Sequence, residues 1–198
     1  MIKLILFDIN GVFLTLEDDP FVEKFAKKYG LTKVEFQDVY DRFTISAEYD
    51  NISSEKAWQD LLDYFHIREN ARSAFESAMK LKKVIPGMFE LLAKVKEKRK
   101  VAYLTNYYPL AWEYCNKKWD LEEKFDGGIV SFQVKARKPE EKGFKIILQQ
   151  FNLKPEEILF IDDGLKNVKA AQLLGMQAIH FQNKQQLEKQ LKKLRVIA

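Results

Sequence analysis

The stretch Leu4-Ile5-Leu6-Phe7-Asp8-Ile9-Asn10-Gly11-Val12 decides how this chain folds. An apolar run ends there on a carboxylate, Asp8, and the chain then turns through Gly11. A continuous apolar run of this length, expected as a strand over residues 2–8, is typical of a parallel sheet buried on both faces. Because open α/β sheets hold their ligands at the carboxyl ends of their strands, Asp8 is expected at a ligand-binding edge.

Strands and helices alternate again in the second half of the chain. Further strands are predicted at residues 101–104, 128–130, 158–161 and 177–181. Helices are predicted around residues 88–95, 109–118, 140–151 and 165–174, with a Lys-rich amphipathic helix at the end. This alternation predicts an α/β fold with a Rossmann-like parallel sheet, helices on both of its faces and right-handed crossovers.

The segment between the first two predicted strands has helical patterns only. Asp19 before Pro20 is a predicted N-cap, Thr32 and Glu35 match a capping box, and two more helices begin near Ser53 and residue 69. We therefore expect a small helical-bundle cap at residues 16–84, inserted after the first strand. The α/β core would then comprise residues 1–15 and 85–198.

Composition limits the partners and the compartment. The net charge of +4, from 33 basic and 29 acidic side chains, is too mild to indicate nucleic acid. No apolar stretch approaches the roughly 20 residues that span a bilayer, so no membrane partner is expected. Cys115 is the only cysteine, which excludes an intrachain disulfide and fits a reducing cytoplasm. Both a monomer and a homodimer remain open.

Polar groups follow four places where predicted strands end or lead into loops. They are Asp8, Thr105, Lys138 and the pair Asp162-Asp163. The carboxylates are hard oxygen ligands that suit Mg²⁺, which prefers one or two carboxylates together with substrate phosphate. Thr105, Asn106 and Lys138 offer donors to phosphoryl oxygens. Asp8 is then predicted to attack phosphorus as a nucleophile, so the expected partner is a small phosphorylated metabolite.

With these residues in place, the sequence resembles the haloacid dehalogenase-like (HAD) hydrolase superfamily. The matching pieces are Phe7 to Val12, Tyr103 to Asn106, Arg137 to Pro139, and Phe160 to Ala171 followed by Leu174-Gly175. All four family motifs occur in order, and the helical insert stands where the family has its cap. The segment Glu48 to Trp58 also resembles the sugar-phosphate phosphatase branch, which includes α-glucose-1-phosphate phosphatases.

The resemblance implies a role for each matched residue. Asp8 would be the nucleophile and a metal ligand, and Asn10 would give its backbone carbonyl to the metal. Asp163 would bind Mg²⁺ directly, and Asp162 would do so directly or through water. Thr105 and Lys138 would hold the phosphoryl oxygens. Asn167 would support the metal ligands from behind.

Asn10 departs from the family pattern, because most family phosphatases have an Asp there as general acid and base. An amide cannot donate and recover a proton in this way, and such a loss typically costs about 10²–10⁴-fold in rate. The leading interpretation is a Mg²⁺-dependent phosphatase that acts on a small phosphate ester, such as a sugar phosphate. The alternative is a low-activity or non-catalytic homologue that binds phosphorylated ligands. A 2-haloacid dehalogenase is a third interpretation, against which Asp162 and Asp163 argue, since that reaction needs no metal.

Several other side chains carry two interpretations each. Arg137 either faces solvent or forms a structural ion pair. Tyr107 and Tyr108 either contact substrate or, as we expect, pack against the cap. Tyr49 and Arg42 are candidate specificity residues of the cap.

Overall fold

The computed structural model describes residues 1–15 and 20–198, so the predicted N-cap Asp19 lies outside the described residues. Its strands are β1 (Leu4–Phe7), β2 (Lys100–Thr105), β3 (Gly128–Val130), β4 (Ile158–Asp162) and β5 (Gln177–His180). They form one five-stranded sheet in the order β3-β2-β1-β4-β5, and every pairing is parallel. The predicted Rossmann-like α/β class is thereby confirmed.

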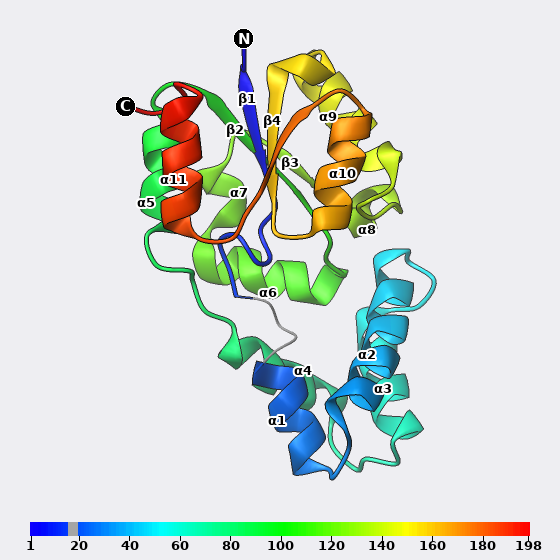
Figure 1. The fold of residues 1–198 in the computed structure, drawn as a ribbon. Helices are drawn as coiled ribbons and strands as arrows, with labels where there is room; N and C mark the ends of the chain where they lie inside the picture. The colour runs from blue at the N-terminus through cyan, green and yellow to red at the C-terminus, as the bar shows by residue number, and fades with distance from the viewer. Residues whose placement is uncertain (16–19) are drawn as a thin grey trace.

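Helices cover both faces of this sheet (Figure 1). They are α5 (Met88–Lys96), α6 (Pro109–Trp119), α7 (Leu121–Lys124), α8 (Ser131–Val134), α9 (Glu141–Phe151), α10 (Leu165–Leu173) and α11 (Lys184–Lys193), with the 3₁₀ turn η1 (Pro155–Glu157) before β4. Alternate strand residues point to opposite faces. Accordingly Ile5 and Phe7 join the apolar cluster with α5, α6 and α11, whereas Leu4 and Leu6 join the one with α9 and α10. The short α7 and α8 were not predicted.

The described residues between β1 and α5 form four helices. They are α1 (Pro20–Lys28), α2 (Lys33–Glu48), α3 (Ser54–Tyr64) and α4 (Ala71–Leu81). The predicted capping box at the start of α2 is present, because the Thr32 hydroxyl accepts from the Glu35 N–H and the Glu35 carboxylate accepts from the Thr32 N–H. Buried aromatic side chains, including Phe36, Trp58 and Phe75, hold these helices together.

The helical group sits beyond the carboxyl ends of the strands (Figure 1). Two chain segments that run side by side join it to the sheet. The Thr15 N–H donates to the Lys83 carbonyl, and the Ile85 N–H donates to the Phe13 carbonyl, each at 2.8 Å. The helices are thus positioned over the edge of the sheet at which Asp8 lies.

Candidate functional site

Three neighbouring strands deliver polar side chains to one edge. Asp8 directly follows β1, Thr105 is the last residue of β2, and Asp162 is the last residue of β4. Because β2, β1 and β4 are adjacent in the sheet, these side chains lie close together. One carboxylate oxygen from each of Asp8, Asp162 and Asp163 lies within 4.8 Å of the others. Parallel pairing and strand length bring Asp8 and Asp162 together, and Asp163 follows in the turn after β4.

Lys138 lies in the middle of the acidic group. Its Nζ is 2.6 Å from Oδ2 of Asp8 and 2.6 Å from Oδ2 of Asp162, and only 2% of its side chain is exposed. The main chain of Lys138 is held in place by Asn106, whose Oδ1 accepts from the Lys138 N–H at 2.9 Å and whose Nδ2 donates to the Lys138 carbonyl at 3.1 Å. Asn106 therefore positions Lys138, and its direct role toward a substrate stays a prediction.

The Asp162-Asp163 turn is fixed by its own hydrogen bonds. Oδ1 of Asp162 accepts from the Gly164 N–H at 2.7 Å and from Nδ2 of Asn167 at 2.9 Å. Asn167 thus contacts Asp162, and its support of a metal ligand stays a prediction. Asp163 lies against Gly11, where a Cβ atom would come within 2.2 Å of the Asp163 Oδ2. The glycine, with a φ of +74°, thus leaves space for the carboxylate.

The charges of this group do not balance. Three carboxylates face one ammonium group, and burial together with the charges of Asp162 and Asp163 raises the pKa of Asp8 to about 7, against the lowering effect of Lys138. Burial and the Asp162 charge likewise raise the pKa of Asp163. Although burial alone would lower it, the charges of Asp8 and Asp162 raise the pKa of Lys138. A divalent cation would offset this excess negative charge, so the donor set suits Mg²⁺.

The Thr105 hydroxyl marks a place for an oxygen-rich ligand. It is fully buried, and its Oγ1 has no hydrogen-bond partner in the described part of the chain. A buried hydroxyl without a partner is costly, and its persistence beside a functional edge indicates a ligand group as its partner. A phosphoryl oxygen held together with Lys138 meets this requirement.

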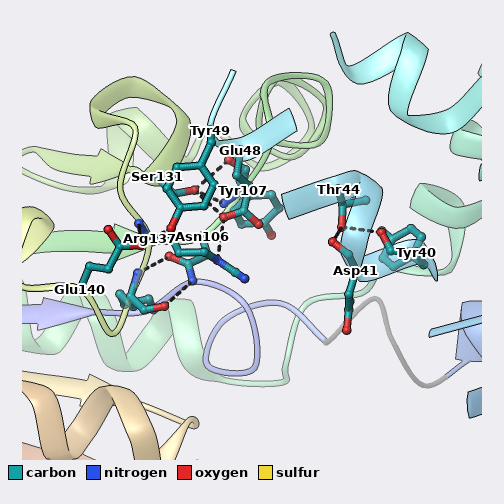
Figure 2. Close-up of polar contacts among 11 residues, drawn as sticks. Tyr40, Asp41, Thr44, Glu48, Tyr49, Asn106, Tyr107, Ser131, Arg137 and Glu140 are labelled. Atoms are coloured by element: carbon teal, nitrogen blue, oxygen red, sulfur yellow. Dashed lines mark hydrogen bonds and ion pairs between the residues drawn. The ribbon is translucent and has the colours of Figure 1, made fainter. Parts of the chain in front are cut away.

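A cavity of about 210 Å³ opens from this group toward the helices. The sheet side contributes Asp8, Asn10 and Lys138, and the helical side contributes one face of α2, with Arg137 at the junction. In Figure 2 the Arg137 side chain lies at the left of the view and the Asp41 side chain at the right. Loss of hydration raises the pKa of the Asp41 carboxyl, while the Gln37 hydrogen bond and the Arg137 charge lower it. The cavity thus joins the acidic group to α2.

A polar network fastens the end of α2 to the sheet side (Figure 2). The buried Glu48 carboxylate lies 3.3 Å from Nε of Arg137, which therefore has the structural ion pair and not the solvent-facing alternative. The same carboxylate accepts from the Ser131 hydroxyl at 3.0 Å. Ser131 Oγ in turn accepts from the Tyr107 N–H at 3.0 Å. The Tyr49 hydroxyl donates to Glu140, and burial with this bond raises the pKa of Tyr49 to about 12.

The aromatic candidates have distinct positions. Tyr107 lines the cavity, and its hydroxyl donates to Oδ1 of Asn10. Tyr108 also lines the cavity, and its hydroxyl accepts from Nε1 of Trp58 in α3 at 3.2 Å, so it packs against the helical group. Arg42 pairs with Asp38 on the exposed side of α2, and neither it nor Tyr49 lines the cavity.

Sequence reasoning missed the cavity-lining residues of α2. They are Tyr40, Asp41, Thr44, Ile45 and Glu48. Their spacing of one, three and four residues is that of one helix face, which the sequence does display. The sequence alone gives no indication that this face, and not the one carrying Arg42, turns toward the sheet.

The described residues contain no helix with the length and apolar character that a membrane span requires.

Comparison with known proteins gives a consistent result. A family model described as haloacid dehalogenase-like hydrolase matches residues 2–175. A phosphorylated carbohydrates phosphatase of Thermotoga maritima is 27% identical over 186 residues, covering 90% of this chain and 84% of the relative. The D-ribitol-5-phosphate phosphatase of Bacteroides thetaiotaomicron is 26% identical over 198 residues, covering 92% and 93%. The crystal structure of a HAD family enzyme of B. thetaiotaomicron in a magnesium complex superposes with a TM-score of 0.79 at 25% identity, covering 92% and 94%.

Proposed function

Because the chain belongs to the haloacid dehalogenase-like hydrolase family, we propose that it is a Mg²⁺-dependent phosphatase acting on a small phosphate ester. The observation that carries this proposal is the contact of Lys138 with both Asp8 and Asp162, beside the buried Thr105 hydroxyl. The same edge of the sheet thus carries a nucleophile, a cation and a hydroxyl that has no hydrogen-bond partner among the described residues. The phosphatases of T. maritima and B. thetaiotaomicron support a phosphorylated carbohydrate or polyol as the substrate.

In the proposed reaction an Asp8 carboxylate oxygen attacks phosphorus. The new O–P bond forms as the ester P–O bond breaks, and the departing alkoxide takes a proton from water to leave as the alcohol. A second water then hydrolyses the aspartyl phosphate to release phosphate and restore Asp8. Thr105 and Lys138 hold the phosphoryl oxygens through both steps. Asp8, Asp162, Asp163 and the main-chain carbonyl of Asn10 would hold Mg²⁺, which when bound offsets charge on the phosphoryl group.

The proposal also assigns separate roles to two domains of the chain. Residues 1–15 and 85–198 form the catalytic core, and residues 16–84 form a cap that covers the site. The cavity between α2 and Asp8 supports this division. Closure of such a cap excludes water from a reacting phosphoryl group.

Asn10 favours a second candidate function, a homologue that binds phosphorylated ligands with little or no turnover. Its side-chain oxygen accepts a hydrogen bond from Tyr107, so the position expected of a proton-transferring group is taken by an amide. Aryl phosphates need little protonation of the leaving group. They would therefore retain more of the reaction than alkyl phosphates do.

Hydrolysis of p-nitrophenyl phosphate with Mg²⁺, and with the metal chelated, tests the proposal. We expect phosphate release that needs Mg²⁺ and is lost in Asp8→Asn. The matched control is Asp38→Asn, which removes an exposed carboxylate of α2 and should retain the rate. Tight binding of phosphate esters by the folded protein without release would favour the binding protein. Halide release from a 2-haloacid without Mg²⁺ would favour the dehalogenase instead.

A further inference from the structure

The wall of the cavity opposite Asp8 is a single face of α2. Tyr40, Asp41, Thr44, Ile45 and Glu48 line it, and Asp8, Asn10 and Lys138 lie on the other side. A phosphate held by Lys138 on the other side would direct its ester group toward this face. The chemistry of the face decides which leaving groups fit.

Of the two carboxylates on this face, one is already used. The Glu48 carboxylate pairs with Arg137 at 3.3 Å and accepts from Ser131 at 3.0 Å. Asp41 differs, because its Oδ1 accepts only a neutral hydrogen bond, from Nε2 of Gln37 at 2.8 Å. Within the described residues Asp41 has no ion pair, and its second carboxylate oxygen has no hydrogen bond. Asp41 is exposed as a residue, although its carboxylate is partly shielded from water, and it lies at the cavity wall, where a ligand can reach it.

We propose that Asp41 is a specificity-determining residue that accepts hydrogen bonds from hydroxyl groups of the leaving group. The preferred substrates are then phosphate monoesters of neutral polyhydroxy compounds, without a second anionic group. The inference rests on the proposed phosphatase function and adds the residue that selects the substrate.

Two physical arguments support this assignment. An ionised carboxylate is an acceptor only, so it bonds well to hydroxyl donors. A second phosphate or carboxylate on the substrate would face the unpaired Asp41 charge, and such like-charge contacts reject a ligand. Arg137 also lines the cavity, where the Glu48 charge 3.3 Å from its Nε offsets its own charge, although that Nε makes no hydrogen bond within the described residues. The cavity volume of about 210 Å³ suits a leaving group of a few carbons.

A matched pair of substrates tests the proposal. Glycerol 3-phosphate and 3-phosphoglycerate are similar in size, but the second carries a carboxylate in place of a hydroxymethyl group. We expect the wild-type kcat/KM to favour glycerol 3-phosphate. Asp41→Asn should lower that value by about 10- to 100-fold, the range for a lost hydrogen bond to a charged group. The loss for p-nitrophenyl phosphate should be clearly smaller, and Asp41→Lys should raise kcat/KM for 3-phosphoglycerate.

Asp38→Asn is the matched control, since Asp38 lies three residues earlier on α2 and pairs with Arg42 away from the cavity. Equal effects of Asp38→Asn and Asp41→Asn, or a wild-type preference for 3-phosphoglycerate, would overturn the proposal. Both variants change exposed positions, so circular dichroism should show the wild-type fold.

Binding separates this proposal from the proposed function. In the Asp8→Asn background with Mg²⁺, calorimetry compares glycerol 3-phosphate with inorganic phosphate. Asp41→Asn should weaken the binding of glycerol 3-phosphate and leave the affinity for inorganic phosphate unchanged, and this result would support the role of Asp41. It would do so even if the wild-type protein showed no turnover, because absent turnover counts only against the phosphatase function. Binding of glycerol 3-phosphate that ignores Asp41, or no binding at millimolar concentration, overturns the role.

Discussion

The Tyr107 hydroxyl donates a hydrogen bond to the side-chain oxygen of Asn10, 2.5 Å away. The two residues are 97 positions apart and meet at the cavity wall. The contact fixes the orientation of the amide, because its oxygen is engaged and its NH₂ group is turned away from Tyr107. The Asn10 side chain therefore has a fixed orientation in the site, at the position where the family pattern has an Asp.

The first prediction concerns proton transfer at position 10. Asn10→Asp should raise the rate for alkyl phosphates by about 10²-fold, the lower end of the range for general acid–base catalysis, and by less for p-nitrophenyl phosphate. Steady-state kinetics on both substrates measures the difference. Asn51→Asp, at an exposed position, is the control for the added charge. A rate that does not change on either substrate would contradict the acid–base explanation.

The second prediction concerns the Tyr107 contact. Tyr107→Phe removes the donor to Asn10 and should lower the free energy of unfolding by about 1 kcal/mol, as is typical for one hydrogen bond. Urea unfolding of Tyr107→Phe, Asn10→Ala, which removes the acceptor, and the double variant gives a coupling energy between the two positions. Strict additivity of the two single changes would mean that the hydrogen bond contributes nothing.

The third prediction concerns metal binding and pH. The pKa of Asp8, about 7 in the folded protein against 3.8 ordinarily, is raised mainly by burial. The folded protein thus holds this proton more tightly, so the stability that it contributes is complete below about pH 4 and is lost as pH rises through 7. Melting temperatures from pH 4 to 8 with the metal chelated should fall accordingly, and Asp8→Asn should flatten the decline.

Magnesium should reverse that loss, because a bound cation offsets the carboxylate charges. We expect Mg²⁺ to raise the melting temperature of the wild-type protein at pH 8 and to raise that of Asp163→Asn much less. Without metal, Asp163→Asn should be the more stable protein, since burial and Asp162 disfavour the charged form of Asp163. Equal responses of the two proteins to Mg²⁺ would remove Asp163 from the metal site.

The fourth prediction distinguishes the backbone strain of a side chain at Gly11 from the steric clash of its Cβ atom with Asp163. Gly11→Ala places a residue at a φ of +74°, at a cost of about 1–3 kcal/mol, and drives its Cβ to 2.2 Å from Asp163. Gly30→Ala is the matched control, because Gly30 has a φ of +69° and no atom within 4 Å of its added Cβ. Chemical unfolding should show a larger loss for Gly11→Ala, and only that variant should lose the Mg²⁺ response.

The sequence predicts those parts of the site that depend on strand ends. Asp8, Thr105 and Asp162 follow or end buried apolar runs, and parallel pairing then brings them together without further information. Lys138 was expected from its order along the chain. Its two equal contacts with Asp8 and Asp162 depend on the main-chain bonds from Asn106, which no pattern indicates.

The residues that escaped prediction are those whose environment is set by packing between distant segments. An amphipathic pattern shows that α2 has a buried face, but it does not show which neighbouring positions border the cavity. Asp41 and Arg42 are adjacent, yet only Asp41 lines the cavity, whereas Arg42 pairs with Asp38. The same holds for Glu48, whose partners Ser131 and Arg137 are more than 80 residues away.

The fifth prediction compares two ion pairs that join α2 and the turn after it to the sheet side. Glu48 is buried and bonds to Arg137 and Ser131, whereas Asp50 pairs with Lys135 at 2.9 Å with both side chains at least 60% exposed. Glu48→Gln should lower the free energy of unfolding by about 1–3 kcal/mol, because it weakens bonds to a buried charge. Asp50→Asn should change it by less than about 1 kcal/mol, as for exposed pairs.

The kinetic consequence follows from the partners of Ser131. Its hydroxyl oxygen also accepts from the Tyr107 N–H, so loss of the Glu48 charge loosens a contact that holds the main chain of Tyr107. We therefore expect Glu48→Gln to lower kcat for alkyl phosphates as well as stability, and Asp50→Asn to lower neither. Steady-state kinetics beside urea unfolding checks both effects. If the two variants behaved alike, the group of helices α1–α4 would be held by apolar packing, such as that around Trp58, and not by the Glu48 network.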